Sequence, residues 1–253
     1  MNLVCVAKSD VGKKRSHNED AYHVDVELGL FAVADGMGGH AAGEVASQEA
    51  LAALVDMLLD NKQVLDDFRA APGKDNARDV SRLLDRAVRA AAYQVFAMSQ
   101  VEPERKGMGT TLSALLVQPT AGFIAHVGDS RIYMLRDGQI RQITHDHTYV
   151  AEMIKKGKMT PEEAQRSRFA NLLVRAVGSN DFVLVDIRIV RCQPGDMFLL
   201  CSDGLSGYLE SPREIVEHVA ATDMAGSVQK LIDLALERGG RDNITVVLVR
   251  LDP

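Results

Sequence analysis

The chain has 253 residues, of which 46% are apolar and 25% charged, so it is long enough for one large domain or two small ones with a sizeable core. A formal net charge of −6, without a Lys/Arg-rich stripe, argues against nucleic acid as the main partner. No apolar run approaches the ~18 residues that span a bilayer, and the N-terminus lacks the apolar stretch of a signal peptide, so we expect a cytoplasmic protein with no membrane span.

The N-terminal part of the chain predicts a small sheet covered by two helices. Residues 3–7, 22–26 and 30–34 have the pattern of strands, and the last two are expected to pair as a hairpin. After Gly43 the apolar spacing becomes helical, and the apolar positions of residues 80–98 mark one face of a second long helix. Two such helices side by side would cover one face of the sheet.

From Gly109 onward the apolar period is again that of strands. The strands expected here are 112–118, 123–128, 131–136, 184–190, 197–201 and 244–251. The first three are predicted to form a meander, and 184–190 is predicted to pair with 197–201 as a hairpin. Two further helices are expected between Ser211 and the stop signal Gly239-Gly240.

A polar, helix-forming segment at about 148–170 interrupts this strand-rich half. We interpret it as a flap inserted beside the functional site, because substrate selectivity often resides in such segments. The preceding run Thr144-His145-Asp146-His147-Thr148 contains two histidines, but acids elsewhere in the chain offer hard oxygen ligands rather than a zinc set. We therefore interpret this run as a structural turn and helix cap.

The order of these elements predicts an α+β fold. Strands, two helices, more strands, two helices and a last strand are typical of antiparallel sheets flanked by helices. The absence of regular β-α-β alternation argues against a parallel doubly wound sheet. The sequence contains no internal repeat and no linker, so residues 1–253 are expected to form a single domain.

One local pattern, an acid beside Gly, Ser or Asn at the end of a strand, recurs along the chain. It occurs in Asn18-Glu19-Asp20, Asp35-Gly36, Gly128-Asp129-Ser130, Ser202-Asp203-Gly204 and Asp242-Asn243. Carboxylates that converge repel one another unless cations compensate their charge. The pattern predicts a cluster that binds divalent cations, although the Asp35 segment alone would suit a tight strand-to-helix turn equally well. Near the first acids, Arg15 has a side chain that can bind a phosphate group through two nitrogens.

Cysteine-based chemistry is not expected. Cys5, Cys192 and Cys201 lie in apolar, strand-like runs, where we interpret them as reduced core thiols. None of them is followed by an arginine six positions later, so the chain lacks the phosphate-binding loop of cysteine-dependent phosphatases.

Seven motifs follow one another along the chain: Arg15-Ser16-His17-Asn18-Glu19-Asp20, Asp35-Gly36-Met37-Gly38-Gly39-His40, Gly109-Thr110-Thr111, Val127-Gly128-Asp129-Ser130-Arg131, Thr144-His145-Asp146-His147, Ser202-Asp203-Gly204 and Asp242-Asn243-Ile244-Thr245. In this order they resemble the motifs of metal-dependent protein phosphatases of type 2C in their bacterial form. The resemblance runs from about residue 9 to residue 250. It implies a four-layer αββα sandwich, in which helix pairs flank two antiparallel sheets and the site lies at one end of the sheets.

The resemblance also implies a centre with two Mn²⁺ or Mg²⁺ ions. Asp35 would bridge the two ions, and Asp203 and Asp242 would complete the protein ligands of one of them. Asp129, together with Asp203, would hold a looser third ion.

The second ion and the phosphate would be held by the N-terminal half of the site. The carbonyl of Gly36 and the carboxylate of Glu19 or Asp20, partly through water, would serve the second ion. Arg15 would clamp the phosphate. Asn243 would support the centre, either as a ligand or by holding one.

The reaction implied is hydrolysis of a phosphoserine or phosphothreonine ester without a phospho-enzyme. A water that bridges two hard cations loses a proton near neutral pH and attacks phosphorus in line, while the cations and Arg15 neutralise the phosphoryl oxygens. Eukaryotic relatives have a histidine where this chain has Met37, and that histidine is proposed to protonate the leaving alkoxide. His40 or a metal-bound water could replace it here, and a purely structural role of His40 is equally open.

Two other functions compete with this one. The first is a regulatory pseudophosphatase that binds phosphoproteins or metal without turnover, which the intact set Arg15, Asp35, Asp203 and Asp242 argues against. The second is a metal-dependent phosphodiesterase or nuclease, which the acidic composition disfavours. The expected partners are phosphorylated proteins and an opposing bacterial Ser/Thr kinase of eukaryotic type, and we expect a monomer.

Overall fold

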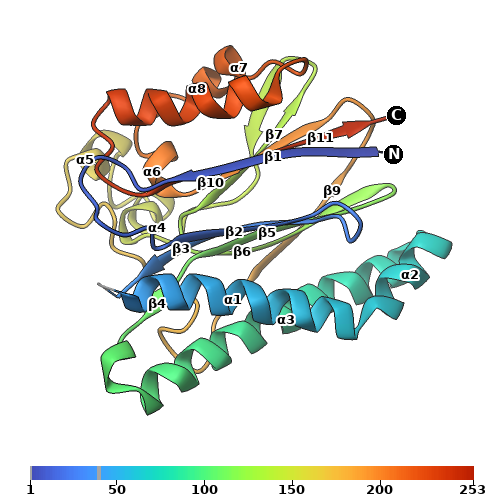
Figure 1. Cartoon of the computed structure of the whole chain (residues 1–253), viewed down its shortest axis with the longest axis horizontal. Coiled ribbons are helices and arrows are strands. Elements are labelled where there is room, and N and C mark those ends of the chain that lie inside the picture. The colour runs from blue at the N-terminus through green and yellow to red at the C-terminus, as the bar shows by residue number, and fades with distance from the viewer. Residues whose placement is uncertain (1, 39–40) are drawn as a thin grey trace.

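The computed structural model describes residues 2–38 and 41–253. Met1, Gly39 and His40 lie outside the described residues, and so does the possible role of His40 as proton donor. The described chain folds into four layers, in the order helices, sheet, sheet and helices, which Figure 1 shows from the side. The expected α+β sandwich with two antiparallel sheets is therefore confirmed.

Both sheets are built from antiparallel pairs. The β1 sheet has the order β1-β11-β10-β7-β8, with bounds Asn2–Asp10, Ile244–Asp252, Met197–Cys201, Arg131–Arg136 and Gln139–Gln142. The β2 sheet has the order β2-β3-β5-β6-β9, with bounds Asp20–Asp25, Leu30–Met37, Leu112–Gln118, Ala121–Val127 and Asp186–Arg191. A short strand, β4 (Gly109–Thr110), pairs with the end of β3.

Helices cover the outer face of each sheet (Figure 1). On the β2 sheet lie α1, α2 and α3, with bounds Ala41–Asp60, Lys62–Ala70 and Lys74–Val101, and a 3₁₀ turn at Pro103–Arg105 follows α3. On the β1 sheet lie α6, α7 and α8, with bounds Asp203–Ser206, Arg213–His218 and Met224–Glu237. The second helical layer is therefore one long helix with two short ones rather than an even pair.

The side chains of the strands fill separate cores, because successive residues of a strand point to opposite faces. On β3, Leu30, Ala32 and Ala34 pack against the α1 and α3 layer, whereas Phe31 and Val33 pack between the two sheets. A third core lies between α8 and the β1 sheet. Since both faces of the central strands are buried, their sequences are almost continuously apolar.

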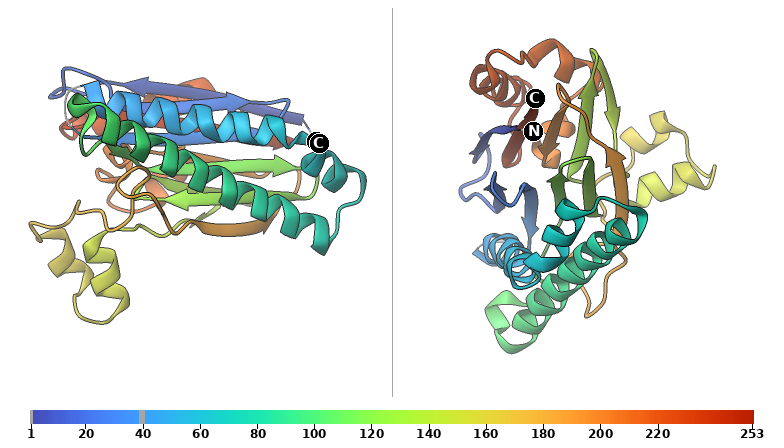
Figure 2. Two further views of the ribbon diagram at one scale, coloured as in Figure 1. Left: turned by 90° about the horizontal axis from the view of Figure 1, so that it is seen from below. Right: turned by 90° about the vertical axis from the view of Figure 1, so that its right-hand side faces the viewer.

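The expected flap is a separate excursion of the chain that carries α4 (Tyr149–Lys155) and α5 (Pro161–Gln165). Figure 2 shows these helices standing away from both sheets. The two ends of the excursion are held together by an isolated bridge between Thr148 and Leu173. Within it, the Thr160 hydroxyl and the Glu163 carboxylate form a reciprocal capping box at the start of α5.

Two of the expected strand pairings are wrong. β9 pairs with β6, whereas β10 pairs with β7 and β11, so 184–190 and 197–201 belong to different sheets and form no hairpin. β6 and β7 also belong to different sheets, and the chain crosses between them at Gly128-Asp129-Ser130. β6, β7 and β10 are buried on both faces, so their sequences do not reveal which neighbour they pair with. The short connection from β9 to β10 does not determine whether the two strands share a sheet. The expected hairpin of β2 and β3 is confirmed, and β7 pairs with β8 as a further hairpin.

All three cysteines are free thiols. Cys192 and Cys201 are buried and Cys5 is partly buried, which confirms their interpretation as reduced thiols of the sheets. Burial raises the pKa of each thiol to about 12, so all three stay protonated at neutral pH. Within residues 2–38 and 41–253, no helix is both long enough and apolar enough to cross a membrane.

Candidate metal and phosphate site

Five of the predicted acids meet at one end of the two sheets. Asp20 and Asp35 face each other across β2 and β3, Asp203 begins α6 directly after β10, and Asp242 precedes β11. Asp129 lies where the chain crosses from β6 to β7. Figure 1 shows the end of β3, α6 and the flap helices on the same side of the molecule. Removal from water, and then the charges of the other four acids, raise the pKa of Asp35 well above its usual value.

The two carboxylate oxygens of Asp20 have different surroundings. Oδ2 accepts hydrogen bonds from the hydroxyls of Ser202 and Thr245, each at 2.7 Å. Oδ1 is buried without a hydrogen-bond partner among the described residues, as is Oδ1 of Asp203. Burial raises the pKa of Asp20 to about 7; the charges of Asp203 and Asp242 act in the same direction and the two hydroxyls in the opposite one.

The backbone of Asp35 is fixed by two threonines. Its N–H donates to Thr111 Oγ1 at 2.9 Å, and its carbonyl accepts from the Thr111 N–H and the Thr110 hydroxyl, both at 2.9 Å. Thr111 Oγ1 also lies 2.7 Å from Ser130 Oγ. From its sequence, the motif at 109–111 could equally be a ligand contact or a bend; in the structure it holds the strand end that carries Asp35.

Gly36 has no room for a side chain. A Cβ atom at this position would lie 2.1 Å from the carbonyl oxygen of Gly43 and 2.6 Å from that of Glu19. The N–H of Gly36 donates to the Glu19 carbonyl at 3.1 Å. A Cβ atom at Gly43 would in turn lie 2.8 Å from Glu19 Oε1. Because neither glycine has a side chain, the first turn of α1 can pass close to the end of β3. The Glu19 carboxylate lies beside both glycines.

Arg15 lies against the acids as a counter-charge. Its Nη2 donates to Asp242 Oδ2 at 2.8 Å, and its Nη1 is 3.7 Å from Glu19 Oε2. Burial and then the charge of Asp242 raise the pKa of Asp203, while Arg15 acts to lower it. Because the Arg15 side chain is 46% exposed, its guanidinium remains accessible to a phosphate group that enters from solvent.

Asn243 connects the N-terminal loop to the start of β11. Its Oδ1 accepts from the N–H of Glu19 at 2.8 Å, and its Nδ2 donates to the carbonyls of Val11 and His17, both at 2.9 Å. The side chain is buried and all of these partners are backbone groups. It therefore fixes the loop that carries Arg15 and Glu19 relative to Asp242.

Asp129 and Asp203 line a cavity of about 700 Å³ whose other wall is the flap. The flap contributes apolar side chains to this wall, among them Val150, Ile154 and Ala164. Burial, and then the charge of Asp203, raise the pKa of Asp129 to about 7. The cavity thus has acids on one side and apolar flap residues on the other.

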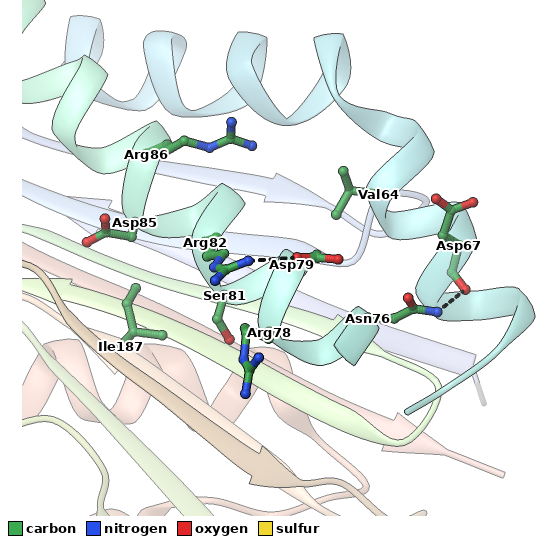
Figure 3. Close-up of a pocket in the computed structure, with 10 residues that line it drawn as sticks. All are labelled: Val64, Asp67, Asn76, Arg78, Asp79, Ser81, Arg82, Asp85, Arg86 and Ile187. Atoms are coloured by element: carbon green, nitrogen blue, oxygen red, sulfur yellow. Dashed lines mark hydrogen bonds and ion pairs between the residues drawn. The ribbon is translucent and has the colours of Figure 1, made fainter. Parts of the chain in front are cut away.

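A second cavity, of about 620 Å³, lies between α2, α3 and β9, away from the acids. Figure 3 shows that arginines and acids alternate along the α3 side of its lining. Arg82 forms an ion pair with Asp79 at 3.4 Å. The described lining contains none of the predicted site residues, and its charges of both signs indicate a solvated helix surface.

The donor set at the carboxylate cluster fits divalent cations. In residues 2–38 and 41–253, no group of three or more His, Cys, Asp or Glu side chains could hold a metal ion as it stands. An ion here would therefore need backbone carbonyl or water oxygens in addition to carboxylates, as hard cations commonly take. The buried Oδ1 atoms of Asp20 and Asp203 have no hydrogen-bond partner among the described residues, so each can serve as an oxygen ligand. Burial and the charges of neighbouring acids raise the pKa of both groups, as expected where carboxylates converge.

Several residues that hold the site were not singled out from the sequence. Ser202 and Thr245 hold Asp20, and Thr111 and Ser130 connect the strand ends beside Asp35 and Asp129. The available signal is local: each of these hydroxyl residues belongs to a motif that also contains an acid, or to the threonine pair. A hydroxyl beside a buried carboxylate is the usual means of satisfying one of its oxygens.

Comparison with known proteins identifies the family to which this fold belongs. A family model described as protein phosphatase 2C matches residues 12–236. The chain therefore belongs to the protein phosphatase 2C family. Within it, the chain is 43% identical over 242 residues to the serine/threonine protein phosphatase PstP of Mycobacterium tuberculosis, an alignment that covers 96% of this chain and 44% of that protein. It is 34% identical to the serine/threonine phosphatase stp of Listeria monocytogenes, over 97% of this chain and 94% of the relative.

A solved structure of a relative has the same fold. The catalytic domain of PstP in complex with two manganese ions superimposes with a TM-score of 0.83 and 42% identity, and the match covers 100% of this chain and 99% of that one. The expected family, its sandwich fold and a catalytic domain of the metal-dependent Ser/Thr phosphatase type are confirmed. The expected cofactor, a pair of Mn²⁺ or Mg²⁺ ions, is confirmed for this relative as two manganese ions.

Proposed function

We propose that the protein hydrolyses phosphoserine and phosphothreonine residues of other proteins at the carboxylate cluster. The observation that carries the proposal is the meeting of Asp35, Asp203 and Asp242 beside Arg15 at a solvent-accessible edge, in a fold whose relatives are Ser/Thr phosphatases. Oxygen ligands for cations and a guanidinium for phosphate are the parts that phosphoryl transfer requires.

In this proposal the metal centre has the ligands expected from the resemblance. Asp35 bridges two ions, Asp203 and Asp242 serve one, and Asp129 with Asp203 serves a looser third. When bound, the ions supply Lewis acidity that lowers the pKa of a coordinated water and neutralises phosphoryl oxygens.

On the other side of the centre, the Gly36 carbonyl and Glu19 or Asp20 serve the second ion. The ligand atom of Asp20 would be Oδ1, because Oδ2 accepts hydrogen bonds from two hydroxyls. Asn243 holds the backbone of Glu19 in place.

Arg15 orients the substrate. Its guanidinium contacts Asp242 and is open to solvent, so it can exchange part of this contact for a bidentate contact with the phosphate. Met37 has no proton to give to the leaving alkoxide, so we assign the proton donor to His40 or to a coordinated water, as the sequence suggested.

The family also supports a proposal for the cellular setting. We infer that the protein is a cytoplasmic monomer that reverses a bacterial Ser/Thr kinase of eukaryotic type. Size-exclusion chromatography with light scattering tests the oligomeric state. Comparison of phosphoproteomes with and without the gene of this protein identifies its substrates, which are then tested as substrates of the kinase.

The central test is hydrolysis of a phosphothreonine peptide in Mn²⁺, with EDTA as the metal-free arm. We expect turnover in Mn²⁺ that is lost in EDTA and in Asp35→Asn, while Asp79→Asn on the surface of α3 keeps full activity. Peptide binding by the wild-type protein without phosphate release would instead establish the pseudophosphatase. Faster cleavage of single-stranded DNA than of the peptide would establish the nuclease.

A further inference from the structure

His147 is joined by two hydrogen bonds to Gly128, the residue before Asp129. The N–H of His147 donates to the Gly128 carbonyl at 2.7 Å, and the N–H of Gly128 donates to His147 Nδ1 at 3.1 Å. Gly128 has a φ of 108°, and a Cβ atom there would lie 2.6 Å from Thr111 Cγ2. The backbone that leads into Asp129 is thus held on one side by Thr111 and on the other by His147.

The same histidine holds the flap. Its carbonyl accepts from the N–H of Val174 at 2.8 Å, and the next residue, Thr148, bridges to Leu173. The backbone of His147 therefore donates toward the Asp129 loop and accepts from the segment that returns from the flap. His147 is therefore bonded both to the residue before Asp129 and to the segment that returns from the flap, and Asp129 and the flap line the 700 Å³ cavity.

The orientation of the His147 ring is fixed as well. Because Nδ1 accepts from Gly128, the proton of the neutral ring is on Nε2, which lies 3.4 Å from Asp186 Oδ2 on β9. Arg175 Nη1 lies 3.3 Å from Nε2 and donates to Asp186 Oδ1 at 2.9 Å. Burial, and then the charge of Arg175, lower the pKa of His147 and keep the ring neutral, as the bond from Gly128 requires.

The residue after Asp129 is fixed from inside the sheets. The carbonyl of Ser130 accepts from Ser113 Oγ at 2.8 Å, and Ser130 Oγ lies 2.7 Å from Thr111 Oγ1. Ser113 lies on β5, and Thr111 precedes that strand. Further along, Arg131 donates to both carboxylate oxygens of Asp146, the residue before His147. The bonds of the His147 backbone connect the residue before Asp129 directly to the segment that returns from the flap.

We propose that His147 is a positioning residue that couples the flap to Asp129, so that a shift of one cavity wall displaces the other. When the returning flap segment moves, its hydrogen bond displaces the His147 carbonyl. The two hydrogen bonds between His147 and Gly128 then displace the peptide that orients Asp129. The catalytic consequence rests on the proposed function, in which Asp129 serves the looser ion. The coupling itself is a property of the metal-free chain.

Two variants of His147 separate its contacts. In His147→Asn, the amide oxygen lies where Nδ1 was and can accept from Gly128, whereas in His147→Gln the amide reaches toward Asp186 and cannot. In metal-free protein, hydrogen–deuterium exchange should be at least 10-fold faster in His147→Gln for the Gly128 amide and for flap peptides. In His147→Asn it should stay within about 3-fold of wild type. Equal exchange at Gly128 in all three proteins, or equal acceleration in both variants, overturns the proposal.

A second pair of variants tests the coupling from the flap and leaves His147 intact. Val174→Pro removes the N–H that donates to the His147 carbonyl, and Val174→Ala keeps it; the Val174 side chain is 47% exposed, so the fold should survive both. We expect faster exchange at the Gly128 amide in Val174→Pro only. Faster exchange that stays confined to the flap contradicts the coupling.

Kinetics then separate this inference from the proposed function. For His147→Gln we expect the KM for a phosphothreonine peptide and the Mn²⁺ concentration at half-maximal rate to rise 5- to 10-fold, with kcat within about 3-fold of wild type. His147→Asn should behave as wild type. A wild-type protein without turnover would reject the proposed function and leave the exchange results standing. An active wild type with unaltered exchange in His147→Gln would reject the inference alone.

Discussion

Asp20 and Asp35 lie directly opposite each other on the neighbouring strands β2 and β3. Asp20 is 8% exposed, and each of the two carboxyl groups has a raised pKa. Two acids in this relationship compete for protons unless cations bind between them and their neighbours. The stability of the chain and its affinity for metal should therefore depend on the same few groups.

Asp35→Asn should stabilise the metal-free protein while it abolishes activity. The substitution replaces a buried carboxyl group, whose ionisation burial and the neighbouring acids oppose, by a neutral amide. This should raise the free energy of unfolding in EDTA by about 1 kcal/mol and the melting temperature by roughly 2–4 °C. Wild type should gain stability on addition of Mn²⁺ and Asp35→Asn should gain little, because the ion stabilises only the state that binds it. Thermal melting with and without Mn²⁺ measures both, and a variant that melts below wild type in EDTA would contradict this account of the cluster.

The metal-free protein should lose stability as the pH rises. The pKa values of Asp20 and Asp129 are about 7 in the folded chain and about 4 in an unfolded one, so the folded chain binds more protons between these values. This contribution is complete below about pH 4 and is lost as the pH passes through about 7. In EDTA we expect the free energy of unfolding in urea to fall by on the order of 2 kcal/mol between about pH 5 and pH 8. Asp20→Asn should flatten the curve, and a wild-type curve that rises over this range would exclude the effect.

Gly36→Ala should be among the most damaging small substitutions. The added Cβ would lie 2.1 Å and 2.6 Å from two backbone oxygens, which cannot move away as a flexible side chain can. We expect a loss of about 3 kcal/mol or more of unfolding free energy, measured in urea. Gly73→Ala is the matched control, because the nearest atom to its added Cβ would be 3.9 Å away. Equal stability of the two variants would show that the backbone of α1 does not pack closely against Gly36.

Arg15 should act on substrate rather than on folding. Its ion pair with Asp242 is partly exposed, so Arg15→Ala should change the free energy of unfolding by less than about 1 kcal/mol. The kcat/KM for a phosphothreonine peptide should fall about 100-fold in Arg15→Ala and about 10-fold in Arg15→Lys, because lysine keeps the charge but loses the bidentate fork. Arg78→Ala, on the exposed side of α3, serves as control. Equal activity of Arg15→Lys and wild type would remove the bidentate role.

The sequence predicts best those parts of the site that depend on local patterns. The hairpin that opposes Asp20 and Asp35 follows from two short strands separated by a turn, and the αββα layers follow from the order of strands and helices. The change of sheet at Gly128-Asp129-Ser130 is not visible in the same way, because the strands on both sides are apolar on both faces.

Contacts between distant segments are also beyond local patterns. Asn243 holds carbonyls that precede it by more than 220 positions, and a lone asparagine beside an acid gives no sign of such partners. His147 was interpreted from its sequence as part of a structural turn. In the structure it forms hydrogen bonds with Gly128 and Val174, which lie far from this turn in the sequence. Periodicity reports on faces of one element, whereas these bonds depend on how separate elements pack.

The hydroxyl bonds to Asp20 connect the two sheets, since Asp20 lies on β2, whereas Thr245 lies on β11 and Ser202 directly follows β10. A substitution of Asp20 would consequently change both the activity and the contact between the two sheets, so its effect in cells could not be assigned to either one. For trapping phosphoproteins in cells, Asp35→Asn is the better choice, because the bonds of Asp35 to Thr110 and Thr111 come from its backbone and survive the exchange.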